Sequence, residues 1–295
     1  MKGIVLKGPD YYLSYFELKR VAKAYNDKIE RVSKKLVLVN DGQYFDRLGL
    51  SKYLFEVKII EEPDRFYLDK PINPIIIKEQ NYNISNRIKM DFKGEKWVIV
   101  KSDKVYAGPL LKINRIPKER LPHNKPCFHP SSIIPTLAKV LINLTGLKEG
   151  TIYDPFCGIG GILIEAALMG FQVKGSDIDE KMLECAKQNL LYYGIKEFEL
   201  AKCDARDLCL DGDAIVTDPP YGRYSKVYGN ILELYKGFLS KAIEKNINIV
   251  SMLYPEFLNP ELFVPKGYKI LLDRPWVSPG IRRHFLLLER RNKNE

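Results

Sequence analysis

Two short motifs in the second half of the chain carry the residues best suited to chemistry. The first is Asp154-Pro-Phe-Cys-Gly158-Ile-Gly160-Gly161, between a predicted strand and a predicted helix. Glycines there permit a tight turn and let a ligand approach the backbone at the carboxyl edge of a sheet. The following helix adds free N–H groups and a partial positive charge, which suit an anion such as a carboxylate. The motif therefore predicts a small-molecule site.

Acidic residues near this motif indicate which molecule it binds. Asp177 lies 23 positions after Asp154, at the end of the next predicted strand, where a carboxylate accepts hydrogen bonds from ribose hydroxyls. Asp204 follows the third strand, where an adenine amino group would lie, although a strand-end turn is the simpler explanation of that residue alone. A nicotinamide cofactor fits less well, because Leu163 stands where the third glycine of G-x-G-x-x-G belongs and Asp154 has no role beside a pyrophosphate. As a set, these acids favour S-adenosylmethionine, which is cationic and carries no phosphate.

The second motif is Thr217-Asp218-Pro219-Pro220-Tyr221-Gly222, after the fourth predicted strand. Two consecutive prolines remove backbone donors and leave carbonyls free. The Asp218 carboxylate and the Pro219 carbonyl then present acceptors only, which can hold both hydrogens of an exocyclic amine and direct its lone pair at a methyl group. Tyr221 can stack on the base that carries the amine. The alternative is a proline-rich turn capped by an aspartate.

Charge divides the chain into two unlike halves. Residues 1–125 contain 26 Lys and Arg against 16 Asp and Glu, whereas the remaining residues contain 21 of each, so the formal net charge of +10 lies wholly in the first half. This asymmetry predicts a basic module for a polyanion beside a neutral module with another task. The alternative is a merely solvated, lysine-rich surface.

The cysteines and the hydropathy bear on the compartment. Five cysteines without a C-x-x-C pair predict a reducing environment rather than a disulfide framework, and His123, Cys127 and His129 lack the second cysteine pair that a zinc site needs. The longest stretch without a charged residue, Pro126–Ala138, is too short to span a bilayer, and the N-terminus lacks the pattern of a signal peptide. We expect a soluble, intracellular protein that uses no metal and no membrane.

The periodicity of the chain predicts which elements position the motifs. The first half combines short strands (Lys35–Val39, Ile75–Ile77, Trp97–Val100) with a helix near Tyr15–Asn26, and the proline-containing stretch Ile113–Pro130 is typical of an extended linker. The second half alternates strands and helices, as in a parallel sheet covered on both faces. Its first helix follows Ser132, whose hydroxyl is the expected N-cap. Its last two strands, Tyr268–Arg274 and Arg283–Glu289, form a hairpin that adds an antiparallel edge. The other expected elements are strands at Thr151–Tyr153, Gln172–Ser176, Phe198–Lys202, Ala214–Thr217 and Ile247–Leu253, and helices at Gly161–Met169, Glu180–Tyr193 and Ile231–Ile243.

These residues resemble a known family. Asp154–Gly161, Asp177 and Asp218–Tyr221 look like motifs of S-adenosylmethionine-dependent amino-methyltransferases. The stretch from Leu121 to Ser132 is similar to the entry into the catalytic domain of archaeal tRNA guanine-N2 methyltransferases acting at position 10, and the order of modules is the same. The resemblance implies a Rossmann-like α/β domain with a seven-stranded methyltransferase sheet and an antiparallel closing hairpin, over 131–295. It also implies a linker at 113–130 and a smaller α+β region at 1–112, with a ferredoxin-like part and a shortened THUMP domain that binds tRNA.

The resemblance implies specific site residues and an activity. The expected activity is a cytoplasmic tRNA N2-guanosine methyltransferase, which transfers the methyl in line, with no metal and no covalent intermediate. The alternatives are a methyltransferase for tRNA position 6 or for rRNA, a DNA amino-methyltransferase and a non-catalytic RNA-binding protein; a homodimer or a small partner subunit stays open. His129 and Ser131 contact the cofactor or form a packed turn. Arg223, Trp276, Arg282 and Arg283 lie on or near predicted loops and are candidates to hold RNA phosphate or a base, although a surface charge or a core aromatic is the simpler explanation of each. The catalytic set is Asp218, Pro219, Pro220 and Tyr221, and the cofactor set is His129, Ser131, Asp154, Pro155, Phe156, Gly158, Gly160, Asp177, Ile178, Asp204, Ala205 and Asp218.

Overall fold

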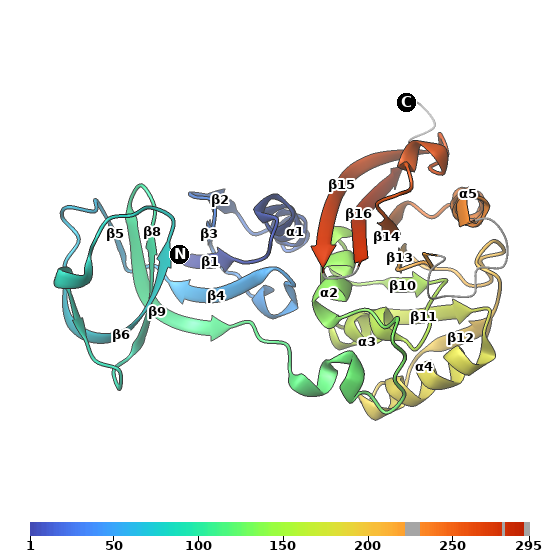
Figure 1. Cartoon of the computed structure of the whole chain (residues 1–295), viewed down its shortest axis with the longest axis horizontal. Coiled ribbons are helices and arrows are strands. Elements are labelled where there is room, and N and C mark those ends of the chain that lie inside the picture. The colour runs from blue at the N-terminus through green and yellow to red at the C-terminus, as the bar shows by residue number, and fades with distance from the viewer. Residues whose placement is uncertain (222–230, 279–280, 292–295) are drawn as a thin grey trace. The chain divides into compact units, whose positions relative to one another are not determined.

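The structure is a computed structural model that describes residues 1–221, 231–278 and 281–291 (Figure 1). It divides into two compact units, Met1–Arg115 and Ile116–Glu295, each of which is described by itself. The predicted RNA-contact residue Arg223 lies outside the described residues.

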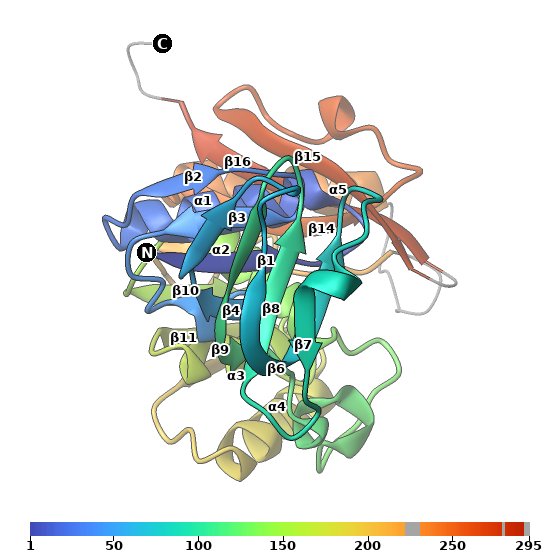
Figure 2. The same cartoon turned by 90° about the vertical axis from the view of Figure 1, so that its left-hand side faces the viewer.

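The first unit is a nine-stranded sheet with one helix. The strand order is β2-β3-β1-β4-β9-β8-β6-β7, with β5 paired to β9; β6 runs parallel to β7 and β8, and the other pairs are antiparallel (Figure 2). The helix is α1 (Tyr11–Ala24). The strands are β1 (Lys2–Leu6), β2 (Ile29–Arg31), β3 (Leu36–Val39), β4 (Ser51–Glu56), β5 (Ile59–Glu61), β6 (Leu68–Lys78), β7 (Ile88–Met90), β8 (Lys96–Lys101) and β9 (Val105–Ile113).

The helix of the first unit begins earlier than the sequence predicted. Asp10 is its N-cap, because the Asp10 carboxylate accepts hydrogen bonds from the backbone N–H groups of Tyr12 (2.8 Å) and Leu13 (3.3 Å). The expected start at Tyr15 is therefore wrong by one turn. The three predicted strands are present, and β6 extends well beyond the predicted Ile75–Ile77.

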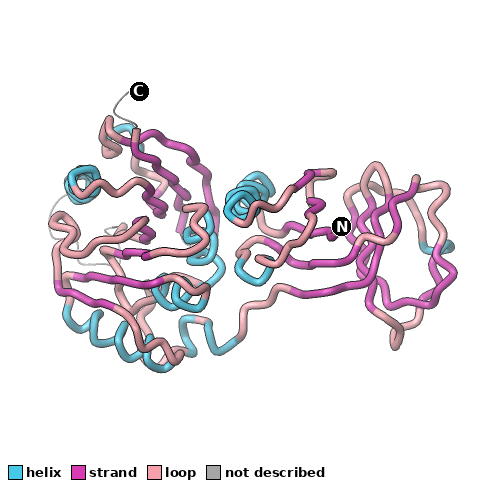
Figure 3. Tube along the Cα trace, turned by 180° about the vertical axis from the view of Figure 1, so that it is seen from behind, coloured by secondary structure: helices cyan, strands magenta, loops and turns pink. Residues whose placement is uncertain are grey.

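The second unit alternates helices with a seven-stranded sheet of order β12-β11-β10-β13-β14-β16-β15 (Figure 3). The five strands from β12 to β14 are parallel, and β16 enters antiparallel between β14 and β15. This confirms the predicted Rossmann-like sheet and its closing hairpin. In chain order the elements are α2 (Pro135–Leu144), β10 (Thr151–Asp154), α3 (Gly161–Leu168), β11 (Gln172–Asp177), α4 (Glu180–Tyr192), β12 (Glu199–Lys202), β13 (Ala214–Thr217), α5 (Ile231–Glu244), β14 (Ile249–Pro255), β15 (Tyr268–Ser278) and β16 (Ile281–Arg290).

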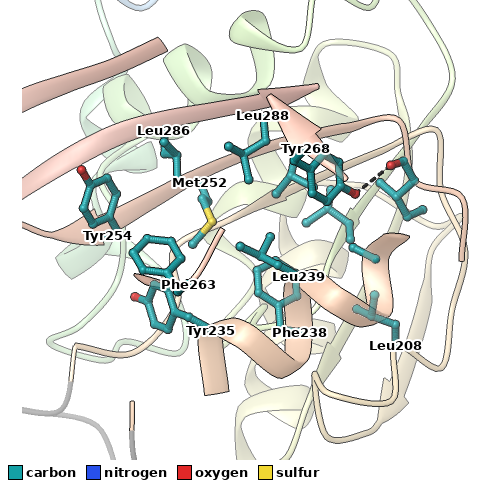
Figure 4. Close-up of a cluster of buried hydrophobic side chains, with 14 of the residues drawn as sticks. Leu208, Tyr235, Phe238, Leu239, Met252, Tyr254, Phe263, Tyr268, Leu286 and Leu288 are labelled. Carbon is teal, nitrogen blue, oxygen red and sulfur yellow. Dashed lines mark hydrogen bonds between the residues drawn. The ribbon is translucent and has the colours of Figure 1, made fainter. Parts of the chain in front are cut away.

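Helices pack on both faces of this sheet. On one face, Tyr235, Phe238 and Leu239 of α5 lie against Met252 and Leu286, residues of β14 and β16 (Figure 4). The hydroxyl of Tyr268 donates a hydrogen bond to the buried carbonyl of Ile247 (2.7 Å), so the polar end of this core tyrosine has a partner within the core. On the other face, α3 approaches β11 so closely that a Cβ at Gly175 would lie 2.5 Å from the Leu163 side chain.

The segment expected to be an extended linker is packed onto the second unit. Arg120 makes two hydrogen bonds to the buried carboxylate of Glu165, and the hydroxyl of Tyr193 donates to the carbonyl of Glu119 (2.6 Å). The Asn189 amide exchanges two hydrogen bonds of 3.0 Å with the backbone of Cys127. Side chains 45 to 74 residues away therefore hold this stretch in place, an arrangement that the prolines alone did not reveal.

Two details of the sequence analysis are wrong here. The N-cap of α2 is Ile134, without a side-chain hydrogen bond, because the Ser132 hydroxyl donates to the carbonyl of His129 instead (2.6 Å). Four of the five cysteines form the disulfides Cys127–Cys185 and Cys203–Cys209, and only Cys157 is free among the described residues. The expectation of unpaired cysteines failed because the fold brings together Cys127 and Cys185, 58 positions apart, and because a turn after β12 brings together Cys203 and Cys209, six positions apart. Disulfides also occur in intracellular proteins of hyperthermophiles, so these bonds do not define a compartment.

Candidate active site

Four acidic residues meet at the carboxyl edge of the second sheet. Asp154 ends β10, Asp177 ends β11, and Asp204 and Asp218 follow β12 and β13. The strand order turns back between β10 and β13, and ligands of open α/β sheets bind in the crevice at such a point. The structure therefore brings the predicted acids to one edge, as the sequence analysis expected.

Asp154 is the most deeply buried of these acids. Its side chain accepts hydrogen bonds from the Thr217 hydroxyl (2.7 Å) and the Phe156 backbone N–H (3.1 Å). Burial, with smaller contributions from the negative charges of Asp177 and Asp218, raises the pKa of Asp154 to about 7, against the lowering effect of its two hydrogen bonds. A cation placed among these three carboxylates would favour their ionised forms, so the site suits a positively charged ligand.

The glycine-rich turn follows Asp154 directly. Gly158 (φ 50°) and Gly160 (φ 82°) adopt left-handed conformations, which bring the chain around to the start of α3 at Gly161. Leu163 stands where a nicotinamide-binding motif would have a glycine that lets the helix pack closely on the strand. Close packing of helix on strand is provided by Gly175 in β11, opposite Leu163, rather than by a glycine in the helix.

Asp177 is tied to the same turn. Its carboxylate accepts from the N–H groups of Gly158 (2.9 Å) and Asp179 (3.0 Å), and burial is the main cause that raises its pKa. The next residue, Ile178, is an exposed apolar side chain (47%) at the sheet edge. In a site for an adenosine, the Asp177 carboxylate would accept from the ribose hydroxyls and the Ile178 side chain would contact the adenine ring.

Asp204 has a partner of its own. Its carboxylate accepts from the backbone N–H of Arg206 and from the Arg206 guanidinium, at 2.9, 2.9 and 2.5 Å, which lowers the pKa of Asp204. These hydrogen bonds form a turn at the end of the strand, which is the simpler of the two predicted roles of Asp204. Ala205 is buried beside it. Any contact of Asp204 with an adenine amino group must share its carboxylate with Arg206.

His129 and Ser131 form a local turn. His129 Nδ1 lies 2.6 Å from the Ser131 hydroxyl; His129 is partly buried and Ser131 is exposed. Of the two predicted roles, the structure displays the packed turn. Nearby, the Lys125 ammonium lies at the start of α3, 3.6 Å from where a Cβ on Gly161 would stand, and burial lowers the pKa of Lys125. The sequence analysis did not select Lys125.

The Asp218 carboxylate is held from two sides. Its Oδ1 accepts a hydrogen bond from the hydroxyl of Tyr221, and its Oδ2 lies 3.3 Å from Nη1 of Arg283. The side chains of Asp218 and Arg283 are each 13% exposed. Burial raises the pKa of Asp218, whereas Arg283 and the Tyr221 hydroxyl lower it. The loop thus presents a buried carboxylate, kept in one orientation.

The two prolines are covered by α5 and by the loop itself. Pro219 is buried, and the carbonyl of Pro220 accepts a hydrogen bond from Tyr235 of α5 (3.4 Å). Pro155 is buried, and Phe156 packs edge-on against Phe238, so these predicted cofactor neighbours belong partly to the core. Among the residues that the structure describes, no group of three or more His, Cys, Asp or Glu is arranged to hold a metal ion.

The predicted RNA-contact residues of the closing hairpin have different environments. Arg283 faces Asp218, and its guanidinium lies 5.8 Å from the centre of the Tyr221 ring. Arg282 is 71% exposed beside Glu256, and Trp276 packs edge-on against Phe285. The sequence analysis missed Thr217 and the pairing of Arg283 with Asp218. Thr217 had a signal, its place at the strand end before Asp218, whereas the pairing of Arg283 had none.

Comparison with protein families identifies methyltransferase sequences. The family described as the RMKL-like methyltransferase domain matches residues 122–256, and the family described as DNA methylase matches residues 7–188. The chain is 37% identical over 244 residues to the tRNA (guanine(10)-N2)-dimethyltransferase of Methanothermobacter thermautotrophicus. It is 31% identical over 253 residues to the protein of the same name from Methanocaldococcus jannaschii. These alignments cover 76% and 81% of this chain, and 70% and 64% of the respective relatives.

A solved structure extends the similarity to the whole chain. TrmN from Thermus thermophilus superposes with a TM-score of 0.60, over 98% of this chain and 99% of its own length. The two sequences are 20% identical, so the comparison confirms the fold.

Proposed function

The chain belongs to the S-adenosylmethionine-dependent methyltransferase family that includes the archaeal tRNA (guanine(10)-N2)-dimethyltransferases, and on that basis we propose that it methylates the exocyclic N2 amine of a tRNA guanine. One observation carries the proposal. The loop that begins at Asp218, with the acceptors of Asp218 and Pro219, lies at the same sheet edge as Asp154, Asp177 and the glycine turn. A cofactor site and an amine-holding site are therefore adjacent.

The residues at the sheet edge fit S-adenosylmethionine. Three mutually repelling carboxylates suit a cation, and the glycine turn leaves its backbone open, since a Cβ on Gly158 would meet no atom within 4 Å. Asp177 can accept from the ribose, and Ile178 can cover the adenine ring. The bound cofactor supplies an electrophilic methyl group on a cationic sulfur.

The work of the chain is then to position the amine. The Asp218 carboxylate accepts the N–H groups of the amine and stabilises the positive charge that develops on nitrogen. The Tyr221 hydroxyl occupies one Asp218 oxygen in this structure, so it must yield when the amine binds. A guanine within a helix must first leave its stack, at a cost of a few kcal/mol, and stacking on the Tyr221 ring offsets part of that cost.

Support for tRNA comes from the relatives and from charge. Met1–Arg115 contains 23 Lys and Arg against 15 Asp and Glu, a net charge of +8. We assign tRNA binding to this unit, as a ferredoxin-like part with a shortened THUMP domain, and position 10 as the target. A tRNA substrate also favours the expected cytoplasmic location.

The alternatives make separate predictions. A tRNA (guanine(6)-N2)-methyltransferase of Thermus thermophilus is 30% identical over 164 residues, and the DNA methylase family also matches the chain. The decisive experiment incubates the protein and labelled S-adenosylmethionine with tRNA transcripts that carry either guanine or adenine at position 10, and identifies the nucleosides by mass. We expect N2-methylated guanosine only when guanine stands at position 10. Equal labelling of both transcripts would place the target elsewhere, and labelling of duplex DNA alone would identify a DNA enzyme.

A further inference from the structure

The first unit contains a concave site that the methyl-transfer chemistry does not use. It is a cavity of about 480 Å³ where β1, β4, β6, β8 and β9 come together. Its lining includes four cationic side chains, Lys7, Lys52, Lys96 and Arg115, together with the ring of Tyr53. We call it the basic hollow.

Four cationic side chains gather in the basic hollow. None of them forms an ion pair within the part of the chain that the structure describes. Other lysines of the unit are paired, such as Lys58 with Glu56 and Lys70 with Glu95, each at 2.7 Å. Among the described residues, therefore, no carboxylate forms an ion pair with these four cations, and Glu17 acts on Lys7 through its charge without forming one.

Lys7 shows that this arrangement costs free energy. Its backbone is fixed, because its N–H donates to the carbonyl of Leu50 (3.0 Å) and its carbonyl accepts from the Ser14 hydroxyl (2.7 Å). The side chain is half-buried, and burial lowers its pKa; the charge of Glu17 opposes this effect, and the charge of Lys52 adds a smaller lowering effect. A half-buried cation beside a second cation is destabilising in isolation. An anion in the basic hollow would reverse that effect.

The chemistry of the lining points to a polyanion. Four positive groups around 480 Å³ exceed what a single small anion needs, and the site is concave rather than flat, unlike a surface that binds a membrane. The Lys52 ammonium lies 5.0 Å from the centre of the Tyr53 ring, so an aromatic face accompanies the charge. Lysine and arginine side chains that replace condensed counterions are the main source of affinity for nucleic acid.

We propose that the basic hollow binds consecutive backbone phosphates of the RNA substrate, with Lys7, Lys52, Lys96 and Arg115 as the contacts. The proposal rests on the proposed function, since it names where that RNA is held. It predicts a site-specific rather than a diffuse effect of charge within the first unit.

The test compares two double variants of the full chain. Lys52→Gln with Lys96→Gln removes two charges from the basic hollow. Lys19→Gln with Lys23→Gln removes two charges from exposed positions on α1, outside it. Binding of an unmodified tRNA transcript is titrated at several salt concentrations. We expect the slope of log K against log salt to become shallower by about 1.4–1.8 in the first variant, for two lost phosphate contacts, and to stay unchanged in the second. Equal slopes in both variants would overturn the proposal.

Lys7→Met provides a second and independent readout. Because the native ammonium is half-buried and has no ion-pair partner among the described residues, we expect the melting temperature of this variant to equal or exceed that of the wild type, while its affinity for the transcript falls. A lower melting temperature with unchanged affinity would mean that Lys7 is structural, which contradicts the proposal.

Further arms separate this proposal from the proposed function and from other anions. Wild-type methylation of the transcript is measured in parallel, and its absence would overturn the proposed function but not the salt slopes. A single nucleotide, cytidine monophosphate, is titrated as a competitor. If cytidine monophosphate displaced the transcript at concentrations near the dissociation constant of the transcript, the basic hollow would be a site for one nucleotide. That result would overturn the binding of consecutive phosphates. We expect only weak competition. We expect a poly-glutamate peptide to compete with the transcript no better than cytidine monophosphate does. Stronger competition by the peptide would identify an acidic protein as the partner instead of RNA.

Discussion

Nη1 of Arg283 lies 3.3 Å from Oδ2 of Asp218, although 65 positions separate them in the chain. The pair forms because β16 runs antiparallel beside β14 and places Arg283 opposite Pro255, at the edge where β13 also ends. Both side chains are almost fully buried, so the guanidinium opposes the effect of burial on the carboxylate. Arg283 is thus placed to orient the Asp218 carboxylate and to favour its ionised form against the effect of burial.

We expect Arg283→Gln to raise the pKa of Asp218, because burial then acts without the opposing cation. The acidic limb of the rate profile should move to higher pH, since a larger fraction of Asp218 is protonated and unable to accept the amine. Single-turnover methyl transfer measured across pH tests this, with Arg283→Lys as the control that retains the charge. An acidic limb that stays in place in Arg283→Gln would show that the arginine has only a packing role.

Replacing Asp218 itself should affect rate rather than cofactor affinity. Asp218→Ala removes the preorganised acceptor, and we expect a loss of at least about 10²-fold in the methyl-transfer rate. Calorimetry should find S-adenosylmethionine bound nearly as in the wild type, since the other acids of the site are retained. A near-normal single-turnover rate would reduce Asp218 to a turn residue.

The raised pKa of Asp154 predicts a pH-dependent cofactor affinity. With its pKa at about 7 in the free protein, Asp154 is mostly neutral at pH 5.5 and mostly ionised at pH 8. A cationic ligand binds the ionised form better, so affinity for S-adenosylmethionine should increase as pH rises toward 7, by at most about tenfold per pH unit. Asp154→Asn should bind more weakly and show no such increase between pH 5.5 and 7. A flat wild-type profile over the same range would contradict this.

Asp177 holds the glycine turn and is the proposed ribose acceptor, and a pair of variants tests both roles. Asp177→Ala removes the ribose acceptor and also leaves the N–H groups of Gly158 and Asp179 without their partner. We expect its affinity for S-adenosylmethionine to fall by more than the roughly 1–3 kcal/mol of one lost hydrogen-bonded group. Asp177→Asn retains an acceptor for the turn and should lose less. Identical losses in calorimetry would mean that the turn does not depend on this side chain.

The contacts of residues 116–125 predict where the second unit can be cut. A fragment that begins at Ile116 keeps Arg120 on the buried Glu165, whereas one that begins at Pro126 removes Arg120 and its two hydrogen bonds and leaves Lys139 as the cation near that carboxylate. Loss of a buried partner costs about 3–5 kcal/mol. We therefore expect the longer fragment to melt at a clearly higher temperature by calorimetry and both to lose the RNA affinity assigned to the first unit. Equal melting temperatures would show that the segment is the linker that the prolines indicated.

Local patterns were enough to predict most of the second unit. Buried parallel strands appear as short apolar runs, and each ends in or just before the aspartate that the site uses, so the order of residues alone was enough to select Asp154, Asp177 and Asp218. The first unit was harder because β2, β5 and β7 have three residues each, too few for a period to show.

Partners that depend on tertiary register could not be predicted. Arg283 was expected to contact RNA because it lies near a turn, and only the pairing of β16 with β14 shows that it faces Asp218. The cysteines were misjudged for the same reason, since no spacing rule relates Cys127 to Cys185. Asp204 shows the opposite case, in which the local explanation, a turn with Arg206, is what the structure displays.

The position of β16 between β14 and β15 has a consequence for folding order. The ribosome produces β14 before β15 and β16, so the strand that finally pairs with β14 is the later of the two. Until then, Val250, Met252 and Leu253 lie on an unpaired apolar edge, the kind of edge at which partly folded chains associate. The same delay leaves Asp218 without Arg283. Pairing of the last hairpin with β14 therefore covers this apolar edge and brings Arg283 to Asp218 in the same step.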